Sequence, residues 1–109
     1  MKLFKNIEKS KALKLSDLVQ YQEGQIVSKT LVQNASVSIT LFAFDKAEEI
    51  SSHASHGDAM LTVLDGKAGI TVGESKSVLS AGETIVMPAD IPHAVYAEEQ
   101  MKFLLTVVF

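Results

Sequence analysis

The stretch GETIVMPADIPHAVYA, residues 82–97, contains two short runs of β-forming residues on either side of a proline-bounded loop. The runs are TIVM (84–87) and HAVYA (93–97), whose β-branched and aromatic side chains favour extended strands. The loop PADIP (88–92) has proline at both ends, which fixes the backbone there and favours a turn. The stretch therefore predicts a strand, a rigid loop and a second strand, with His93 at the transition from loop to strand.

Short runs of the same kind recur along the rest of the chain. SVSITLFAF (36–44) alternates with a period of two, which is typical of a strand with two different faces. The pair Asp65-Gly66 is a strong hairpin-turn signal between MLTVL (60–64) and KAGITV (67–72). Further runs cover residues 24–32 and 101–109. About eight to ten short strands at this spacing predict an all-β barrel or sandwich.

The bulk composition limits the class of protein. With 109 residues and 47% hydrophobic residues, the chain is expected to form one globular domain spanning residues 1–109. No apolar run approaches the roughly 20 residues that cross a bilayer, and the lysine-rich start lacks a signal-peptide pattern. Cysteine is absent, which removes disulfides and thiolate metal ligands. We therefore expect a cytoplasmic protein with no membrane association.

Charge and hydrophobic pattern together indicate the class of partner. The net charge is −3 and all ten basic residues are lysine, so the arginine fork that favours nucleic-acid recognition is missing. The last predicted strand, residues 101–109, is apolar on both faces, whereas a surface strand normally alternates with polar residues. This pattern predicts burial of both faces, in a sandwich centre or in a subunit interface. For so small a chain we expect a homodimer that binds a small molecule and no nucleic acid.

Three histidines stand at predicted loop-to-strand transitions. His53 and His56 are three residues apart, and His93 follows forty residues after the first. The ends of neighbouring strands in a barrel can bring such positions together, where imidazoles could bind Zn, Mn, Fe, Ni or Cu. The spacing matches neither a zinc finger nor HExxH. Spacing alone therefore favours ordinary surface or core histidines over a metal site.

The residues around His53 resemble the first sequence motif of the cupin family, which reads roughly G-x5-H-x-H-x3–4-E-x6-G. HASHGDAMLTVLDG (53–66) carries His53 at the first histidine and Gly57-Asp58 where many cupins have the same pair. It closes with TVLDG, which is similar to the glycine-ended hairpin of the family. We place this motif at about residues 45–66.

The opening stretch resembles the second motif of the family, roughly G-x5-P-x-G-x2-H-x3-N. Gly82, Pro88 and His93 fall in register with this motif, at about residues 82–97. The resemblance spans about residues 36–108 and implies a double-stranded β-helix, a jelly-roll-like barrel of two antiparallel sheets. It also implies a divalent metal, a small organic ligand, or both inside the barrel, although the fold hosts many activities and cannot name the substrate. If the protein is an enzyme, the resemblance implies metal-dependent oxygenase or isomerase chemistry.

Two of the four metal ligands usual in the family are missing. The usual set is three histidines and one glutamate, and only His53 and His93 match it. Ser55 stands at the second-histidine position and Ala59 at the glutamate position. The resemblance therefore implies a degenerate first metal motif.

The period of two along a strand indicates how a metal site could persist. His53, Ser55 and Ala59 share the parity that points into the barrel, whereas His56 has the opposite parity. A bulge at Gly57, where glycine permits a positive φ, would turn His56 inward. His53, His56 and His93 would then form a displaced metal site completed by water, since catalytic zinc needs only three protein ligands.

The competing interpretation is a metal-free pocket that binds or senses a small molecule without catalysis. The residues lining this pocket would be Ser55, Ala59, Leu61 and Val63. Tyr96 and Asp58 are the candidates for proton handling or substrate orientation in a catalytic protein, and packing between strands is the alternative role for Tyr96. The sequence leaves the metal site and the metal-free pocket both open.

Overall fold

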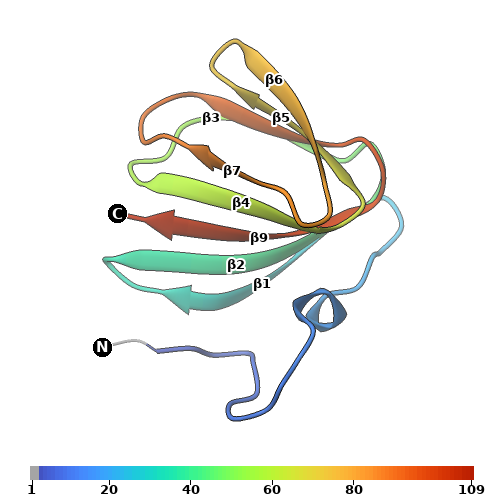
Figure 1. Cartoon of the computed structure of the whole chain (residues 1–109), viewed down its shortest axis with the longest axis vertical. Coiled ribbons are helices and arrows are strands. Elements are labelled where there is room, and N and C mark those ends of the chain that lie inside the picture. Colours follow the sequence, from blue (N-terminus) through green and yellow to red (C-terminus); the bar gives the residue numbers. More distant parts are fainter. Residues whose placement is uncertain (1–2) are drawn as a thin grey trace.

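The computed structural model describes residues 3–109 and consists almost entirely of β-strands (Figure 1). Within these residues, nine strands and one short 3-10 helix, η1, follow one another. In chain order they are η1 (Leu15–Leu18), β1 (Ile26–Gln33), β2 (Val37–Phe44), β3 (Glu49–His53), β4 (Asp58–Asp65), β5 (Lys67–Val72), β6 (Ser75–Ser80), β7 (Thr84–Met87), β8 (His93–Ala97) and β9 (Met101–Val108). The predicted all-β class is confirmed.

The strands form two antiparallel sheets packed face to face. The five-stranded sheet has the order β1-β2-β9-β4-β7, and the four-stranded sheet has the order β3-β8-β5-β6. The last strand, β9, lies in the middle of the five-stranded sheet between β2 and β4 (Figure 1). This order is the jelly-roll-like barrel of two antiparallel sheets that the sequence predicts.

The sequence pattern does not predict two of the strands, β3 and β6, because their sequences are polar. β3 has the sequence EISSH and β6 has the sequence SKSVLS, and most of their side chains are exposed. Both strands are edges of the four-stranded sheet. An edge strand buries few side chains, so it lacks the hydrophobic alternation by which strands are recognised.

The turn at Asp65-Gly66 is a corner between the two sheets and not the predicted hairpin. β4 pairs with β7 and β9, whereas β5 pairs with β6 and β8. Gly66 has a φ of +77°, and a Cβ there would lie 1.8 Å from the carbonyl oxygen of Gln100. Glycine is therefore required at this corner both for its backbone angle and for its close approach to the chain before β9. The hairpin of this region joins β5 to β6 instead, where Val72 pairs with Ser75.

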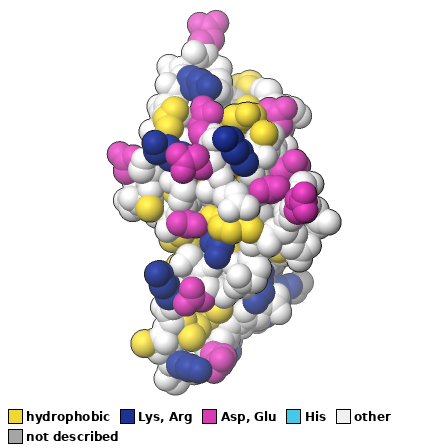
Figure 2. Space-filling view, turned by 90° about the vertical axis from the view of Figure 1, so that its right-hand side faces the viewer, with side chains coloured by type: hydrophobic (Ala, Val, Ile, Leu, Met, Phe, Trp, Pro, Cys, Tyr) yellow, Lys and Arg dark blue, Asp and Glu magenta, His cyan; other side chains and the backbone are white. Residues whose placement is uncertain are grey.

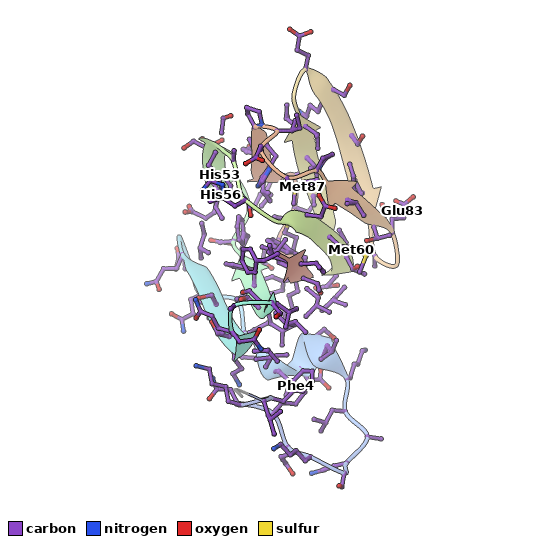
Figure 3. The ribbon with its side chains drawn as sticks, turned by 90° about the vertical axis from the view of Figure 1, so that its left-hand side faces the viewer. Phe4, His53, His56, Met60, Glu83 and Met87 are labelled. Atoms are coloured by element: carbon purple, nitrogen blue, oxygen red, sulfur yellow. The ribbon has the colours of Figure 1, made fainter. Side chains whose placement is uncertain are left out.

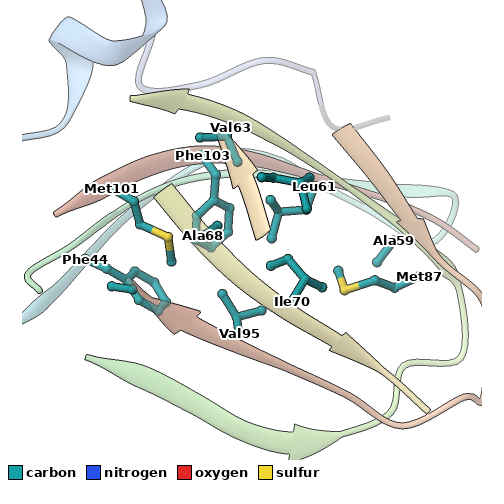
Figure 4. Close-up of a cluster of buried hydrophobic side chains, with 12 residues drawn as sticks. Phe44, Ala59, Leu61, Val63, Ala68, Ile70, Met87, Val95, Met101 and Phe103 are labelled. Carbon is teal, nitrogen blue, oxygen red and sulfur yellow. The ribbon is translucent and has the colours of Figure 1, made fainter. Parts of the chain in front are cut away.

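The main core fills the space between the sheets (Figure 4). Phe44 and Phe103 lie there with ring centroids 5.2 Å apart, and the ring of Phe42 stacks on Phe103 at 5.0 Å. Leu61 and Ile70, from opposite sheets, are fully buried between the same layers. The barrel interior is thus packed with apolar side chains from both sheets, as the alternation of the strands requires.

A second core lies on the outer face of the five-stranded sheet, under the N-terminal segment. Leu41 and Ala43 of β2 are buried there against Val19, and η1 packs beside them. Lys102 donates from Nζ to the carbonyl oxygen of Ser16 at 2.7 Å. It also lies 4.9 Å from the ring centroid of Tyr21. These contacts tie the N-terminal segment to β9.

No helix among residues 3–109 has the length and apolar character needed to cross a membrane.

Candidate functional site

His53 and His93 face each other across two neighbouring strands. β3 and β8 are antiparallel, and His53 pairs directly with His93 in their register. Directly opposed residues in a sheet share a face, and His93 has the inward parity of buried Val95 and Ala97. The two ring centroids are 4.3 Å apart with an interplanar angle of 69°. The structure therefore brings together two of the three predicted metal ligands.

Both imidazoles are oriented by backbone carbonyl groups. His53 Nδ1 lies 3.0 Å from the carbonyl oxygen of Ser51, and His93 Nδ1 lies 3.3 Å from that of Ile91. Because a carbonyl oxygen only accepts hydrogen bonds, each Nδ1 carries the proton and donates. Each Nε2 then keeps its lone pair for a metal ion or a hydrogen-bond donor, which is the arrangement found around metal-ligating histidines. The sequence could not identify these partners, because every residue has a backbone carbonyl group.

The pKa of His93 is shifted downward. The residue is only 4% exposed, and burial is the main cause of the lowered pKa because it disfavours the charged ring. The nearby His53 lowers the pKa further, and the carbonyl group of Ile91 partly opposes this. His93 is therefore neutral at neutral pH, which is the form that binds metal ions.

His56 does not join the pair. Its side chain is 99% exposed, and Nδ1 lies 3.3 Å from Asp90 Oδ1, outside the barrel. Figure 3, which looks onto this end of the barrel, labels both His53 and His56. Within residues 3–109, no cluster of three or more histidine, aspartate or glutamate side chains is arranged to hold a metal ion. The displaced site of three histidines is thus not formed.

The reason lies at Gly57, whose role differs from the predicted one. Gly57 is buried and is not among the glycines with positive φ, so it does not form the expected bulge. A Cβ at this position would lie 2.5 Å from the carbonyl oxygen of Val108 and 2.9 Å from Val107 Cγ1. Glycine is needed here because the chain passes against β9. Residues 54–57 therefore connect β3 to β4 without turning His56 inward, and its side chain stays outside the barrel.

The remaining motif residues fix the loop that carries His93. Asp58 accepts a hydrogen bond from the backbone N–H of Ala89 at 2.8 Å, and the carbonyl oxygen of Ser55 accepts one from Asp90 N–H at 2.7 Å. Asp90 itself has a φ of +64°, a conformation that aspartate adopts more readily than most residues. Asp58, predicted as a candidate for proton handling, therefore positions the loop through its carboxylate.

The predicted pocket residues lie on the inner face of β4 and just before it. Ala59, Leu61 and Val63 are at most 2% exposed and belong to the main core. Ser55 is half-buried, and its hydroxyl accepts a hydrogen bond from the Gly57 N–H at 3.2 Å. The inward direction of Ala59, Leu61 and Val63 follows the predicted parity, and the role of the four residues as the walls of a ligand pocket stays a prediction.

Tyr96 lies on the outer face of the four-stranded sheet, away from the histidine pair. It alternates with buried Val95 and Ala97 and is 37% exposed. It lines a shallow groove of about 290 Å³ together with Glu49, which it opposes in the register of β3 and β8. As a candidate catalytic group, Tyr96 therefore has no access to His53 and His93.

The opposite end of the barrel has a different character. Figure 2 shows lysine and carboxylate side chains interspersed on that end, with no histidine in view. A polar cleft of about 490 Å³ there includes Tyr21, whose hydroxyl donates to the carboxylate of Asp65. Burial and this carboxylate raise the pKa of Tyr21. The imidazole chemistry is thus concentrated at one end of the barrel.

Comparison with known proteins gives the family. A model of the cupin domain matches residues 40–109. The chain is a cupin. Solved structures agree over the whole length of this cupin: a conserved protein of unknown function from Streptococcus pyogenes shares 47% identity, with a TM-score of 0.95, and the match covers 99% of this chain and 95% of that one.

Two further solved structures are also similar to this cupin. A cupin superfamily protein from Desulfitobacterium hafniense shares 30% identity with a TM-score of 0.93 and 97% coverage of both chains. A cupin 2 conserved barrel domain protein from Leptotrichia buccalis shares 44% identity with a TM-score of 0.87, covering 89% of this chain and 47% of that one. A search of curated proteins found no match. These relatives establish the family and the fold, and their descriptions give no activity.

Proposed function

We propose that this cupin binds a divalent transition metal ion through the Nε2 atoms of His53 and His93, and that water or a small organic ligand completes the coordination. The observation that carries the proposal is the facing pair of imidazoles, 4.3 Å apart, with both Nδ1 atoms held by carbonyl groups. Imidazole suits zinc, copper, nickel and iron. A carbonyl partner on Nδ1 directs the lone pair of Nε2 toward such an ion.

The donor set fits half of the site usual in the family. The Ser55 hydroxyl is engaged with the Gly57 N–H, and Ala59 has no donor atom. A metal ion held by two imidazoles keeps several coordination positions for exchangeable ligands, so we expect weaker binding than at a complete site. When bound, the ion would act as a Lewis acid toward an oxygen-bearing ligand.

Binding rather than catalysis is the function proposed. Asp58 is engaged with the loop before β8, and Tyr96 lies on the outer face of the four-stranded sheet. Neither candidate for proton handling reaches the histidine pair. The proposal therefore assigns His53 and His93 to ligation and assigns no residue to a chemical step.

A metal-free function is the second candidate. It is favoured by the small side chains of Ser55 and Ala59 at the two positions without a metal ligand, and by the apolar core beside the histidines. Two imidazoles beside an apolar core could anchor a small organic molecule by hydrogen bonds. Metal titration separates this candidate from the first.

The test is isothermal titration of tag-free protein with Zn²⁺, Ni²⁺ and Cu²⁺. His53→Ala and His93→Ala remove one ligand each. His56→Ala is the matched control, because His56 lies three residues after His53 but its side chain faces solvent outside the pair. We expect the unchanged protein to bind metal. The affinity should fall at least about tenfold in His53→Ala and His93→Ala and should not change in His56→Ala. His53 is exposed, so its variant is expected to fold normally even if His93→Ala does not.

Two results would count against the metal proposal: no binding to the unchanged protein, or an equal loss in His56→Ala. In the first case, small molecules that raise the melting temperature of the unchanged protein but not of His53→Ala would support the metal-free candidate.

A further inference from the structure

The loop before His93 has few backbone N–H groups with which to hold its shape. Its sequence is PADIP, residues 88–92, and proline has no N–H to donate. Each of the three N–H groups that remain has an acceptor: Ala89 donates to Asp58 Oδ1 at 2.8 Å, Asp90 to the Ser55 carbonyl oxygen at 2.7 Å, and Ile91 to the Pro88 carbonyl oxygen at 3.3 Å. The backbone donors of the loop are therefore fully used.

Two carbonyl groups connect the end of this loop to the barrel. The carbonyl oxygen of Pro92 accepts from the Gly73 N–H at 2.8 Å, and that of Ile91 lies 3.3 Å from His93 Nδ1. The Ile91 carbonyl group thus keeps the His93 proton on Nδ1 and the lone pair on Nε2. Its position depends on the loop, because Ile91 lies only two residues after the N–H group that Asp58 holds.

The contact of Asp58 differs in kind from the other contacts of the loop. Apart from His93, Asp58 is the only residue within 3–109 whose side chain hydrogen-bonds to the backbone of residues 88–92. Ser55 uses its carbonyl group, which any residue would provide, and His56 meets only the exposed side chain of Asp90. A substitution at Asp58 can therefore remove one contact of the loop and leave the others in place.

Asp58 does not face the histidine pair. It opposes Val108 in the register of β4 and β9 and is exposed, whereas the next residue, Ala59, is buried in the core. Successive side chains of a strand point to opposite faces, so Asp58 lies on the outer face of the five-stranded sheet. Any effect of Asp58 on His93 must therefore pass through the loop.

We infer that Asp58 is a positioning residue for His93: by holding the Ala89 N–H, it places the Ile91 carbonyl group and so fixes the tautomer and direction of the imidazole. A carboxylate is a strong acceptor for a backbone N–H, because its charge strengthens the hydrogen bond. Groups that hold the second nitrogen of a metal-ligating histidine set its orientation and its affinity for the ion. The consequence for metal affinity rests on the proposed function, whereas the tautomer is a property of the metal-free protein.

The test is the ¹⁵N spectrum of the histidine side chains in metal-free protein at about pH 8, where the imidazole of His93 is neutral because its pKa is lowered. The chemical shifts of the two ring nitrogens report which one carries the proton. His53 provides an internal reference, because its Nδ1 donates to the carbonyl group of Ser51 in β3 and not to the loop. Titration with Zn²⁺ then gives the metal affinity of each variant.

Three variants separate the acceptor from its charge. Asp58→Ala removes the acceptor, whereas Asp58→Asn keeps an acceptor oxygen and removes only the charge. Asp90→Asn is the matched control: it makes the same change within the loop, keeps the N–H that donates to Ser55, and suits the φ of +64° at that position.

We expect only Asp58→Ala to change His93. Its ring nitrogens should shift toward a mixture of tautomers while those of His53 stay unchanged, and the affinity for Zn²⁺ should fall at least about tenfold. Asp58→Asn and Asp90→Asn should keep the tautomer of the unchanged protein. The hydrogen bond of Asp58 is exposed, so we expect Asp58→Ala to fold, and circular dichroism checks this. If it does not fold, Asp58→Glu moves the acceptor by one methylene group and should change His93 in the same direction.

The inference is overturned if a folded Asp58→Ala or Asp58→Glu keeps the His93 tautomer, because Asp58 would then stabilise the loop without directing the imidazole. It is also overturned if Asp58→Asn changes His93 as much as Asp58→Ala, since the charge and not the acceptor would then be responsible. A failure of the unchanged protein to bind Zn²⁺ would contradict the proposed function alone, because the tautomer is measured without metal.

Discussion

Replacement of Gly57 by alanine tests how the mouth of the barrel is built. The new Cβ would lie 2.5 Å from the Val108 carbonyl oxygen, 2.9 Å from Val107 Cγ1 and 3.0 Å from Phe109 Cδ1. Ordinary contacts are about 3.4–4 Å, so the two backbones must separate by about 0.9 Å or more to relieve the contact with the Val108 oxygen. β9 cannot yield easily because it pairs with β2 on one side and β4 on the other.

The expected cost follows from this overlap. Forcing an extra carbon into a packed site costs about 1–3 kcal/mol, and the backbone contact favours the upper part of that range. For a domain of this size, each kcal/mol lowers the melting temperature by about 4 °C, so we expect a decrease of about 8 °C or more. Calorimetry at one protein concentration measures it, because dimer formation would make the melting temperature depend on concentration.

Gly24→Ala is the matched control for this prediction. Gly24 has a φ of +66° and nothing within 4 Å of the position of a Cβ, so alanine there meets only the backbone penalty of about 1 kcal/mol. If the melting temperature falls no further in Gly57→Ala than in Gly24→Ala, the close-approach argument is refuted. Gly57 would then be an ordinary turn residue.

Two further predictions concern ionisable groups. Because the pKa of His93 is lowered in the folded protein, its stabilising effect is complete above the unfolded pKa of about 6.5 and is lost as pH falls below that value. The melting temperature should therefore fall between about pH 6.5 and 5, and less so in His93→Gln. Tyr21→Phe removes the hydrogen bond to Asp65 and should cost about 1 kcal/mol in chemical denaturation. Hydrogen exchange should quicken around η1 in this variant, and unchanged exchange would show that Lys102 alone holds the segment.

The sequence predicts those parts of the fold that local pattern encodes. β2, β5, β7, β8 and β9 follow runs of β-branched and aromatic residues closely. At the corner of Gly66, the Asp-Gly pair indicates a turn but carries no information about which strands pair. That choice depends on the contact with the Gln100 carbonyl group, which no local pattern contains.

The candidate site also has a part that the sequence predicts and a part that depends on tertiary contacts. The motif and the period of two identify His53 and His93, which the structure brings together in one register. The predicted inward turn of His56 depends on Gly57 having a positive φ, but glycine is also required where two backbones approach closely. Only the position of the Val108 carbonyl oxygen distinguishes between these purposes at Gly57.

Restoring a missing ligand gives a last prediction. Ala59 is 2% exposed on the inner face of β4, at the position where the family usually has its metal-ligating glutamate. Ala59→Glu would bury a carboxylate without a partner, which is strongly unfavourable in the absence of a cation. We therefore expect a lowered melting temperature in metal-free buffer and recovery on addition of Zn²⁺, with at least about tenfold tighter binding than in the unchanged protein.

Val63→Glu is the matched control for this gain of function. Val63 is 1% exposed on the same face of β4, four residues further into the barrel, and belongs to the same core. The Val63→Glu variant has the same burial penalty. Zn²⁺ should not restore its melting temperature, because the histidine pair lies at the mouth of the barrel, away from this position. Rescue of Ala59→Glu alone would mean that His53 and His93 already present their Nε2 atoms to the vacant ligand position. If Zn²⁺ restores neither variant, the two imidazoles are not directed toward that position, and the metal-free candidate becomes the better account of the barrel.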